Sequence, residues 1–211
     1  MGKINQGILG GLSGKVGNVI GGSWKGIDYL RIKPSSVANP KTEGQVNQRN
    51  KFTATLEFLQ PNIEFIRVGY KGYAVKQTAF NAAMSEVLNN AIEGTAPNFT
   101  VNYAEALLSK GSLKGMLNGV FDVSTGTQIE FTWDNNSNDI NANAEDKMIF
   151  SVYNPTKKES LVEYGSTRVN GAVIKVLPNN FSGDLVHVFT AFESIDGKVS
   201  NSTYLGSGTV A

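Results

Sequence analysis

Three apolar stretches decide the fold: IEFTW at residues 129–133, MIFSVYN at 148–154 and LVHVFTAF at 185–192. Each is a short run bounded by turn-forming residues, a pattern typical of β-strands. Further strands are predicted at Ser160–Tyr164 and Val199–Leu205. This part of the chain therefore builds a β-sheet structure.

Turn residues separate these strands along residues 119–211. The clearest turns are Asn154-Pro155 and Asp196-Gly197. One more strand is predicted at Ala172–Val176. Six or seven short strands with no helical pattern between them indicate a β-sandwich, with the immunoglobulin or fibronectin III type as the first choice. Trp133, near the end of an early strand, is expected in its core.

Residues 41–94 carry the periodicity of helices instead. Thr42-Glu43-Gly44-Gln45 has the form of a capping box, and Pro61 is expected to end the helix that it begins. A second helix carries an apolar stripe from Phe80 to Ala91, with Gly94 as the expected C-cap. A strand is predicted at Phe99–Tyr103. The helical region with this strand spans 41–118.

The first 33 residues contain nine glycines, at positions 2, 7, 10, 11, 14, 17, 21, 22 and 26. Glycine raises the entropy cost of ordering a segment, so close approach, positive φ or docking is expected here. The runs Val16–Ile20 and Ile27–Ile32 flank Gly21–Gly26, which predicts a hairpin. With a proline-bounded linker, this arm or hairpin spans 1–40. The fold class is α+β, in three parts.

The composition limits the kinds of function that the protein can have. The 211 residues carry a net charge of +1, one histidine and no cysteine. Without cysteine there are no disulfides, thiolate nucleophiles or cysteine metal sites. Residues 1–60 carry +5 and residues 119–211 carry −5. This polarity either steers head-to-tail contacts between copies or is a chance difference between domains.

The sequence also gives expectations for location. No continuous apolar segment with a cleavage site opens the chain, and no stretch of about 18 apolar residues occurs. We therefore expect synthesis in the cytoplasm without a signal peptide, followed by incorporation in a virion or another assembly. The glycine spacing also resembles a membrane zipper, but Asn5, Gln6, Lys15 and Asn18 argue against a membrane partner.

The leading hypothesis is a non-enzymatic structural subunit that self-associates through its N-terminal arm. An extended segment can add a strand to a neighbour's sheet through main-chain hydrogen bonds. The expected partner is a second copy, in a homo-oligomer or a larger assembly. The expected assembly contacts are Val16, Val19, Ile20, Trp24, Ile27, Tyr29 and Arg31. The alternative is a monomeric binding module for carbohydrate, surface polymer or nucleic acid.

Enzyme function ranks third. A Ser/His/Asp triad requires His187, which lies in an alternating strand pattern and is interpreted as a strand residue. No small-molecule substrate is expected. Nucleic acid binding is not favoured, because the basic residues are few and dispersed. The candidates for it are Lys15, Trp24, Lys25, Tyr29, Arg31, Lys33, Arg49 and Lys51.

Calcium is the one candidate cofactor. Asp134, Asn136, Asn138 and Glu145 fall at positions 1, 3, 5 and 12 of an EF-hand-like loop. Asp139 stands where that loop requires glycine, and strands rather than helices flank it. A polar turn between strands is therefore the favoured interpretation, with no cofactor.

One resemblance covers nearly the whole length. Its motif is carried by Ser13-Gly14-Lys15-Val16-Gly17-Asn18 and Trp24-Lys25-Gly26, and it continues with Arg31, Pro34, Pro40, Thr42, Gln45, Gln48, Arg49 and Phe52. Ser109–Leu113 and Ser200-Asn201-Ser202 also match. The chain resembles an uncharacterised domain family of Bacteroidota and their phages. This resemblance implies a small, multi-copy protein of a virion or surface assembly, with no established activity, cofactor or catalytic residue.

Overall fold

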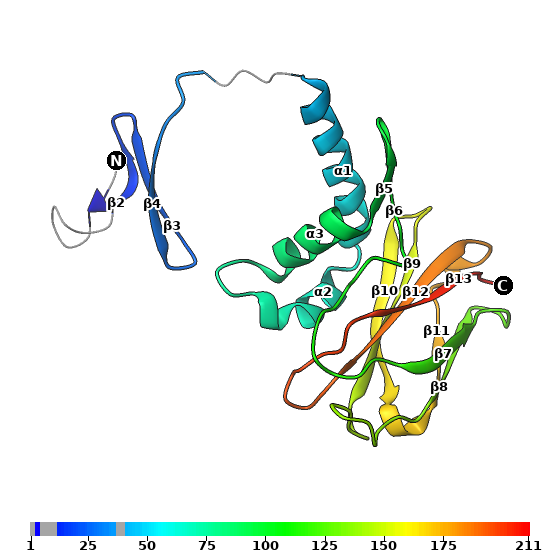
Figure 1. Cartoon of the computed structure of the whole chain (residues 1–211). Helices are drawn as coiled ribbons and strands as arrows, with labels where there is room; N and C mark the ends of the chain where they lie inside the picture. Colours follow the sequence, from blue (N-terminus) through cyan, green and yellow to red (C-terminus); the bar gives the residue numbers. More distant parts are fainter. Residues whose placement is uncertain (1–2, 5–11, 37–40) are drawn as a thin grey trace. The chain divides into compact units, whose positions relative to one another are not determined.

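The computed structural model describes residues 3–4, 12–36 and 41–211. Contacts between residues divide the chain into two compact units, Met1–Gln45 and Val46–Ala211 (Figure 1). The first unit contains a small sheet, and the second contains the helices and two larger sheets. The predicted borders between three parts stay a prediction.

The first unit is built on an antiparallel sheet with the strand order β1-β2-β3-β4. The four strands are β1 (Lys3–Ile4), β2 (Leu12–Val16), β3 (Val19–Trp24) and β4 (Ile27–Ile32). Strands β3 and β4 form a hairpin, but its turn is Lys25-Gly26 rather than the predicted Gly21–Gly26, because β3 runs through Gly21 and Gly22 to Trp24. The predicted run Val16–Ile20 is instead divided by a turn at Gly17-Asn18. The extended arm itself is not confirmed.

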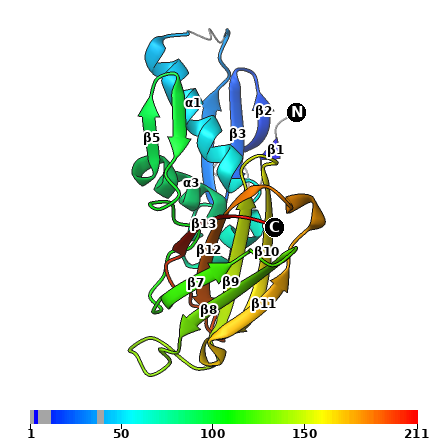
Figure 2. The ribbon, with the colours of Figure 1, turned by 90° about the vertical axis from the view of Figure 1, so that its right-hand side faces the viewer.

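Seven strands of the second unit form two antiparallel sheets (Figure 2). The first, second and fifth of them form a three-stranded sheet with the order β11-β8-β7, and the others form a four-stranded sheet with the order β10-β9-β12-β13. This is the strand arrangement of a fibronectin III-like β-sandwich. The strands are β7 (Leu117–Asp122), β8 (Gln128–Asp134), β9 (Lys147–Asn154), β10 (Glu159–Thr167), β11 (Ala172–Val176), β12 (Leu185–Glu193) and β13 (Thr203–Thr209).

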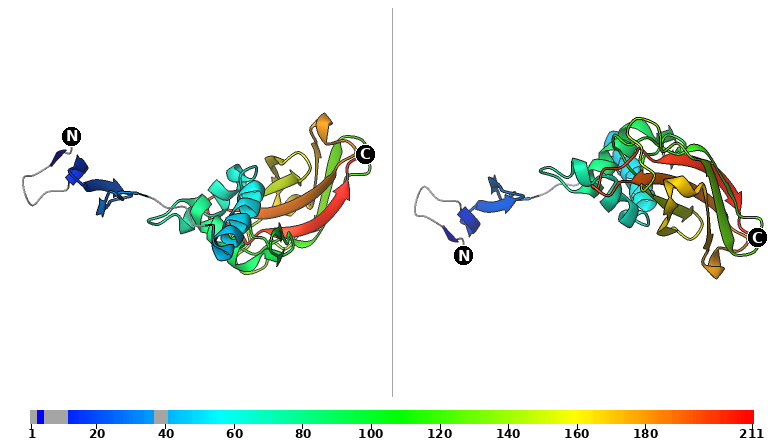
Figure 3. Two further views of the ribbon diagram at one scale, coloured as in Figure 1. Left: turned by 90° about the horizontal axis from the view of Figure 1, so that it is seen from above. Right: turned by 90° about the horizontal axis from the view of Figure 1, so that it is seen from below.

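Helices lie on one side of the four-stranded sheet (Figure 3). They are α1 (Glu43–Leu59), α2 (Ile63–Gly69) and α3 (Ala79–Asn90), and a hairpin of β5 (Ile92–Thr95) and β6 (Asn98–Val101) follows them. Helix α1 begins directly after Thr42 and ends before Pro61, as predicted. Gly94 is not a C-cap, because α3 ends earlier and Gly94 lies in β5 with a φ of 97°.

The four-stranded sheet is the middle of three layers. Phe150, Val188 and Phe192 pack against the three-stranded sheet, together with the buried Trp133. Ile149 and Phe189 point to the other face and pack with residues of the helices. Because both faces are covered, β9 and β12 are buried along almost their whole length. Their largely apolar sequences, with few polar positions, are therefore explained by burial on two sides.

Buried polar groups join the layers. Asn62, fully buried between α1 and α2, accepts hydrogen bonds from Ser151 Oγ (2.5 Å) and Ser160 Oγ (2.9 Å) of the sheet. A buried polar group without a partner is costly, so these bonds fix the helices in position on the sheet.

Two sequence motifs about 90 residues apart also meet. Ser109 Oγ donates to the carbonyl of Ser200 at 2.7 Å, and Leu108 N donates to Ser202 Oγ at 2.8 Å. The segment at 199–202 is thus fixed to the 108–111 loop. This explains why the last strand begins at Thr203 rather than at the predicted Val199.

Candidate functional site

The sheet of the first unit depends on two tight turns. Between β3 and β4, Lys25 and Gly26 have φ values of 48° and 80°. Two successive positive φ values characterise the two-residue hairpin turn whose twist matches the strands. This turn pairs Trp24 with Ile27 and Gly22 with Tyr29. The Tyr29 ring lies over Gly22, where a Cβ would meet its hydroxyl at 3.0 Å.

The expected assembly contacts fall on two different faces of this sheet. Paired residues share a face, so Ile20, Trp24, Ile27, Tyr29 and Arg31 lie together on one face. Val16 and Val19 lie on the other.

Two further residues of the predicted run Ile27–Ile32 belong to the second face. Leu30 and Ile32 pair with Gly21 and Val19, and they are 65% and 76% exposed. The sequence indicates this placement, because Leu30 and Ile32 alternate with Tyr29 and Arg31 along the strand and so lie on the opposite face. Both faces of the sheet therefore expose large apolar side chains.

The nucleic-acid candidates are partly brought together. Lys15 pairs with Ile20, which places it on the face that carries Trp24, Tyr29 and Arg31. Lys51 lies elsewhere, with its amine 5.0 Å from the centre of the Phe99 ring.

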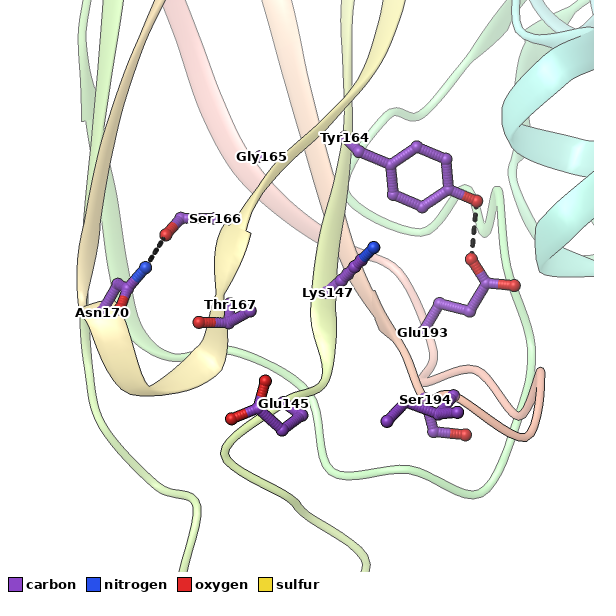
Figure 4. A pocket seen from close by; sticks show the side chains of 10 residues that line it. Glu145, Lys147, Tyr164, Gly165, Ser166, Thr167, Asn170, Glu193 and Ser194 are labelled. Carbon is purple, nitrogen blue, oxygen red and sulfur yellow. Dashed lines mark hydrogen bonds between the residues drawn. The ribbon is translucent and has the colours of Figure 1, made fainter.

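A polar cleft of about 720 Å³ lies on the second unit (Figure 4). It occupies the helix-side face of the four-stranded sheet, beyond the end that the helices cover. Ile149 and Ala191 contact the helical layer, whereas two residues further along the same face are Lys147 and Glu193, which line the cleft. The cleft exists because the sheet extends further than the helices.

An irregularity in β10 shapes one wall of this cleft. The pairing with β9 shifts between Tyr164 and Thr167. Such bulges change the direction of neighbouring side chains. Gly165 lies at this point, where a Cβ would meet Met148 Sδ at 3.1 Å and Val173 at 3.3 Å. The glycine thus lets β10 lie close to the core while Tyr164 and Thr167 line the cleft.

Tyr164 and Glu193 form the fixed part of the cleft. The Tyr164 hydroxyl donates to Glu193 Oε2 at 2.6 Å (Figure 4). Burial is the larger cause and this contact with the carboxylate the smaller one, and together they raise the pKa of Tyr164 to about 12. The phenol therefore stays protonated and keeps its hydrogen bond at neutral pH.

Other groups in the cleft are available to a ligand. The structure gives no hydrogen bond or ion pair, within the described residues, to the carboxylate of Glu145, the amine of Lys147 or the hydroxyl of Thr167. Figure 4 shows Glu145 and Thr167 at the same end of the cleft. Acceptors, a donor cation and hydroxyls thus line one space.

The loop considered for calcium is organised around a protein cation. Arg168 is fully buried, and its guanidinium donates to Asn136 Oδ1 (2.6 Å) and Asp146 Oδ2 (3.1 Å). Asp134 instead accepts from Asn118 Nδ2 at 2.8 Å. Glu145 lines the cleft.

This geometry does not support the hypothesis of a calcium site. Among the described residues no group of three or more His, Cys, Asp or Glu side chains is arranged to hold a metal ion. Asn138 lies exposed in the same loop. Metal binding by these four residues stays a prediction, and Arg168 already supplies the positive charge at Asn136.

His187 lies in an aromatic cluster between the sheet and the helical layer. Its Nδ1 is 2.8 Å from the Tyr204 hydroxyl, and its ring centre is 3.9 Å from that of Tyr103. Burial lowers the pKa of His187. The structure thus places this residue, interpreted from the sequence as a strand histidine, in β12 as a buried, neutral ring.

The second unit is an antiparallel β-sandwich with a helical layer on one face. The chain belongs to DUF6266, a family of unknown function, which matches residues 11–206. No curated protein matches the chain in sequence.

Among solved structures, a fibronectin III domain of the human collagen alpha-1(XX) chain is similar with 11% identity and a TM-score of 0.37, over 49% of this chain and 91% of that one. No helix among the described residues is long and apolar enough to cross a membrane.

Proposed function

We propose that this protein is a non-enzymatic structural subunit that self-associates through the sheet β2-β3-β4. The observation that carries the proposal is a small sheet with large apolar side chains exposed on both faces. A sheet of this size needs a covered apolar face for stability. Exposed apolar surface of this kind marks an interaction site.

Charge favours a second copy as the occupant. Residues 1–45 contain six basic and two acidic residues, whereas residues 46–211 contain 13 basic and 16 acidic residues. A basic sheet of one copy and an acidic second unit of the next attract each other. Such a head-to-tail contact repeats from copy to copy, so it builds a ring or a filament.

The edge of the sheet offers a directional bond. Strand β4 is the last strand in the order β1-β2-β3-β4, so one of its sides has no neighbouring strand in the described sheet. Its free main-chain groups can pair with a strand of another copy. A virion or a surface assembly is the setting that we propose for this contact.

The test is the oligomeric state of the full-length protein over a concentration series, measured by sedimentation velocity and negative-stain electron microscopy. The wild type is expected to form species well above 22.7 kDa. Replacing Leu30 and Ile32 by glutamine should reduce them to monomer. The matched control is Ile174→Gln with Val176→Gln, two residues of the outer sandwich face that are 59% and 66% exposed.

Two results would overturn the proposal. One is a wild type that stays monomeric at every concentration. The other is an assembly that the control pair weakens as much as the β4 pair does. A monomer that binds single-stranded DNA through Lys15 and Arg31 would establish the nucleic-acid alternative instead.

A further inference from the structure

We infer that the polar cleft beside Tyr164 is a binding site for a neutral oligosaccharide. The inference does not depend on assembly, because all the residues concerned lie in the second unit. The volume of about 720 Å³ is within the range of small-ligand sites, roughly 300–1,000 Å³. Strands β9, β10 and β12 and the loops beside them supply the walls.

The first argument is the aromatic ring. Tyr164 is 43% exposed, and its hydroxyl is held by Glu193 at 2.6 Å. A sugar presents an apolar C–H surface, which packs against an aromatic ring. Holding the ring in advance reduces the entropy that binding would otherwise cost. Tyr164 therefore provides a fixed surface for one sugar ring.

The second argument is the hydrogen-bonding inventory. Carboxylates accept hydrogen bonds strongly, and the hydroxyls of a sugar are donors. Glu145 has an unoccupied carboxylate in the cleft, and Lys147 and Thr167 can donate to sugar oxygens. Asn170 donates to the Ser166 hydroxyl, which leaves the Asn170 amide oxygen as a further acceptor.

The third argument concerns what the cleft rejects. Glu145 and Glu193 outnumber the single cation, Lys147, so an anionic ligand would meet net repulsion. The cleft exposes apolar surface together with polar side chains, so a wholly apolar ligand would leave the polar groups without hydrogen bonds. A neutral ligand rich in hydroxyl groups satisfies both conditions.

The experiment uses the full-length protein on an array of neutral oligosaccharides of glucose, mannose, galactose and N-acetylglucosamine, printed beside sialylated and sulfated glycans. We expect binding to at least one neutral glycan, followed by titration calorimetry with it. Tyr164→Ala should weaken binding about tenfold or more, because the ring contact is lost. Tyr73→Ala is the matched control, since Tyr73 is 44% exposed.

A second pair of variants tests the carboxylate. Glu145→Gln keeps the side-chain shape and should weaken binding, whereas Glu163→Gln should not, because Glu163 pairs with Lys175 outside the cleft. The inference is overturned if no neutral glycan binds, if only acidic glycans bind, or if Tyr164→Ala behaves as Tyr73→Ala does. A further contrary result is that the protein binds no glycan and that Glu145→Gln dissociates its assembly. The cleft would then be a contact between subunits.

Discussion

A buried guanidinium joins three segments that meet at one end of the sandwich. Arg168 contacts Asp146 and Asn136 and also donates to the carbonyl of Lys114 at 2.8 Å. Its guanidinium carbon lies 3.8 Å from the centre of the Phe192 ring. The entry to β7, the loop before β9 and the end of β10 thus share one cation. A cation with this many partners has a structural role.

Replacing Arg168 by methionine should destabilise the fold strongly. The change leaves the buried carboxylate of Asp146 without its partner, which costs about 3–5 kcal/mol. The free energy of unfolding, from urea denaturation, measures the effect. The control is Lys158→Ala, which removes an exposed ion pair with Glu57 and should cost less than about 1 kcal/mol. Equal effects of the two changes would contradict this role.

His187 should make stability depend on pH. Because burial lowers its pKa from the ordinary 6.5, the unfolded chain binds the proton more readily than the folded chain does. Stability is therefore complete above about pH 6.5 and declines as the pH falls through the folded pKa.

Thermal unfolding between pH 7.5 and pH 5.5 checks this expectation. His187 is the only histidine, so His187→Gln should flatten the slope over this interval. If the variant and the wild type lose stability in parallel, other groups are responsible.

At the scale of elements, the contact between the 108–111 loop and residues 199–202 depends on glycine. A Cβ on Gly111 would lie 2.0 Å from the carbonyl oxygen of Val199. Main-chain atoms cannot move away without breaking the hydrogen bonds of this contact, such as Ser202 N to the Ser109 carbonyl at 3.1 Å. The strand β13 is positioned by this contact.

Gly111→Ala should therefore lower stability by about 2 kcal/mol or more, since overpacking of this kind costs 1–3 kcal/mol. Gly72→Ala is the matched control, because a Cβ there meets nothing within 4 Å. Denaturant midpoints of the two variants give the comparison. An unchanged midpoint for Gly111→Ala would show that the loop adjusts freely.

The sequence predicted where individual strands and helices lie better than it predicted which elements pack against one another. The runs at 148–154 and 185–192 correspond to β9 and β12. They could be predicted because a short apolar segment between two turns is typical of a strand. Strands β7 and β5 were missed, because glycines within Leu117–Asp122 and Ile92–Thr95 resemble turn or cap signals. That the helices cover one face of the sandwich was not predicted, because periodicity identifies a buried face but not what covers it.

The candidate sites show the same limit. The aromatic and apolar residues of the first sheet were identified from two apolar runs of the sequence, but their division between two faces needed the register of the strands. The cleft was not predicted at all. Its residues come from separate segments, and they meet only because the helical layer ends before Lys147 and Glu193.

At the scale of the whole molecule, opposite charges separate along the chain. Assembly through attraction between a basic first unit and an acidic second unit should weaken with salt. Raising sodium chloride from about 0.05 M to about 0.5 M is expected to shift sedimentation profiles toward monomer. Assembly that is unchanged or strengthened by salt would show that apolar contacts alone hold the copies together.

The three-layer arrangement has a consequence for protein synthesis. The apolar faces of α1, α2 and α3 emerge from the ribosome before the sheet does, yet they pack against Phe189 and Ala191, which are made about 100 residues after the end of α3 and about 130 after the end of α1. Until β12 has been translated, these faces have no complete surface on which to dock. Exposed apolar surface of this kind is prone to aggregation and is bound by chaperones. The synthesis of residues 185–193 thus decides when the three helices can dock.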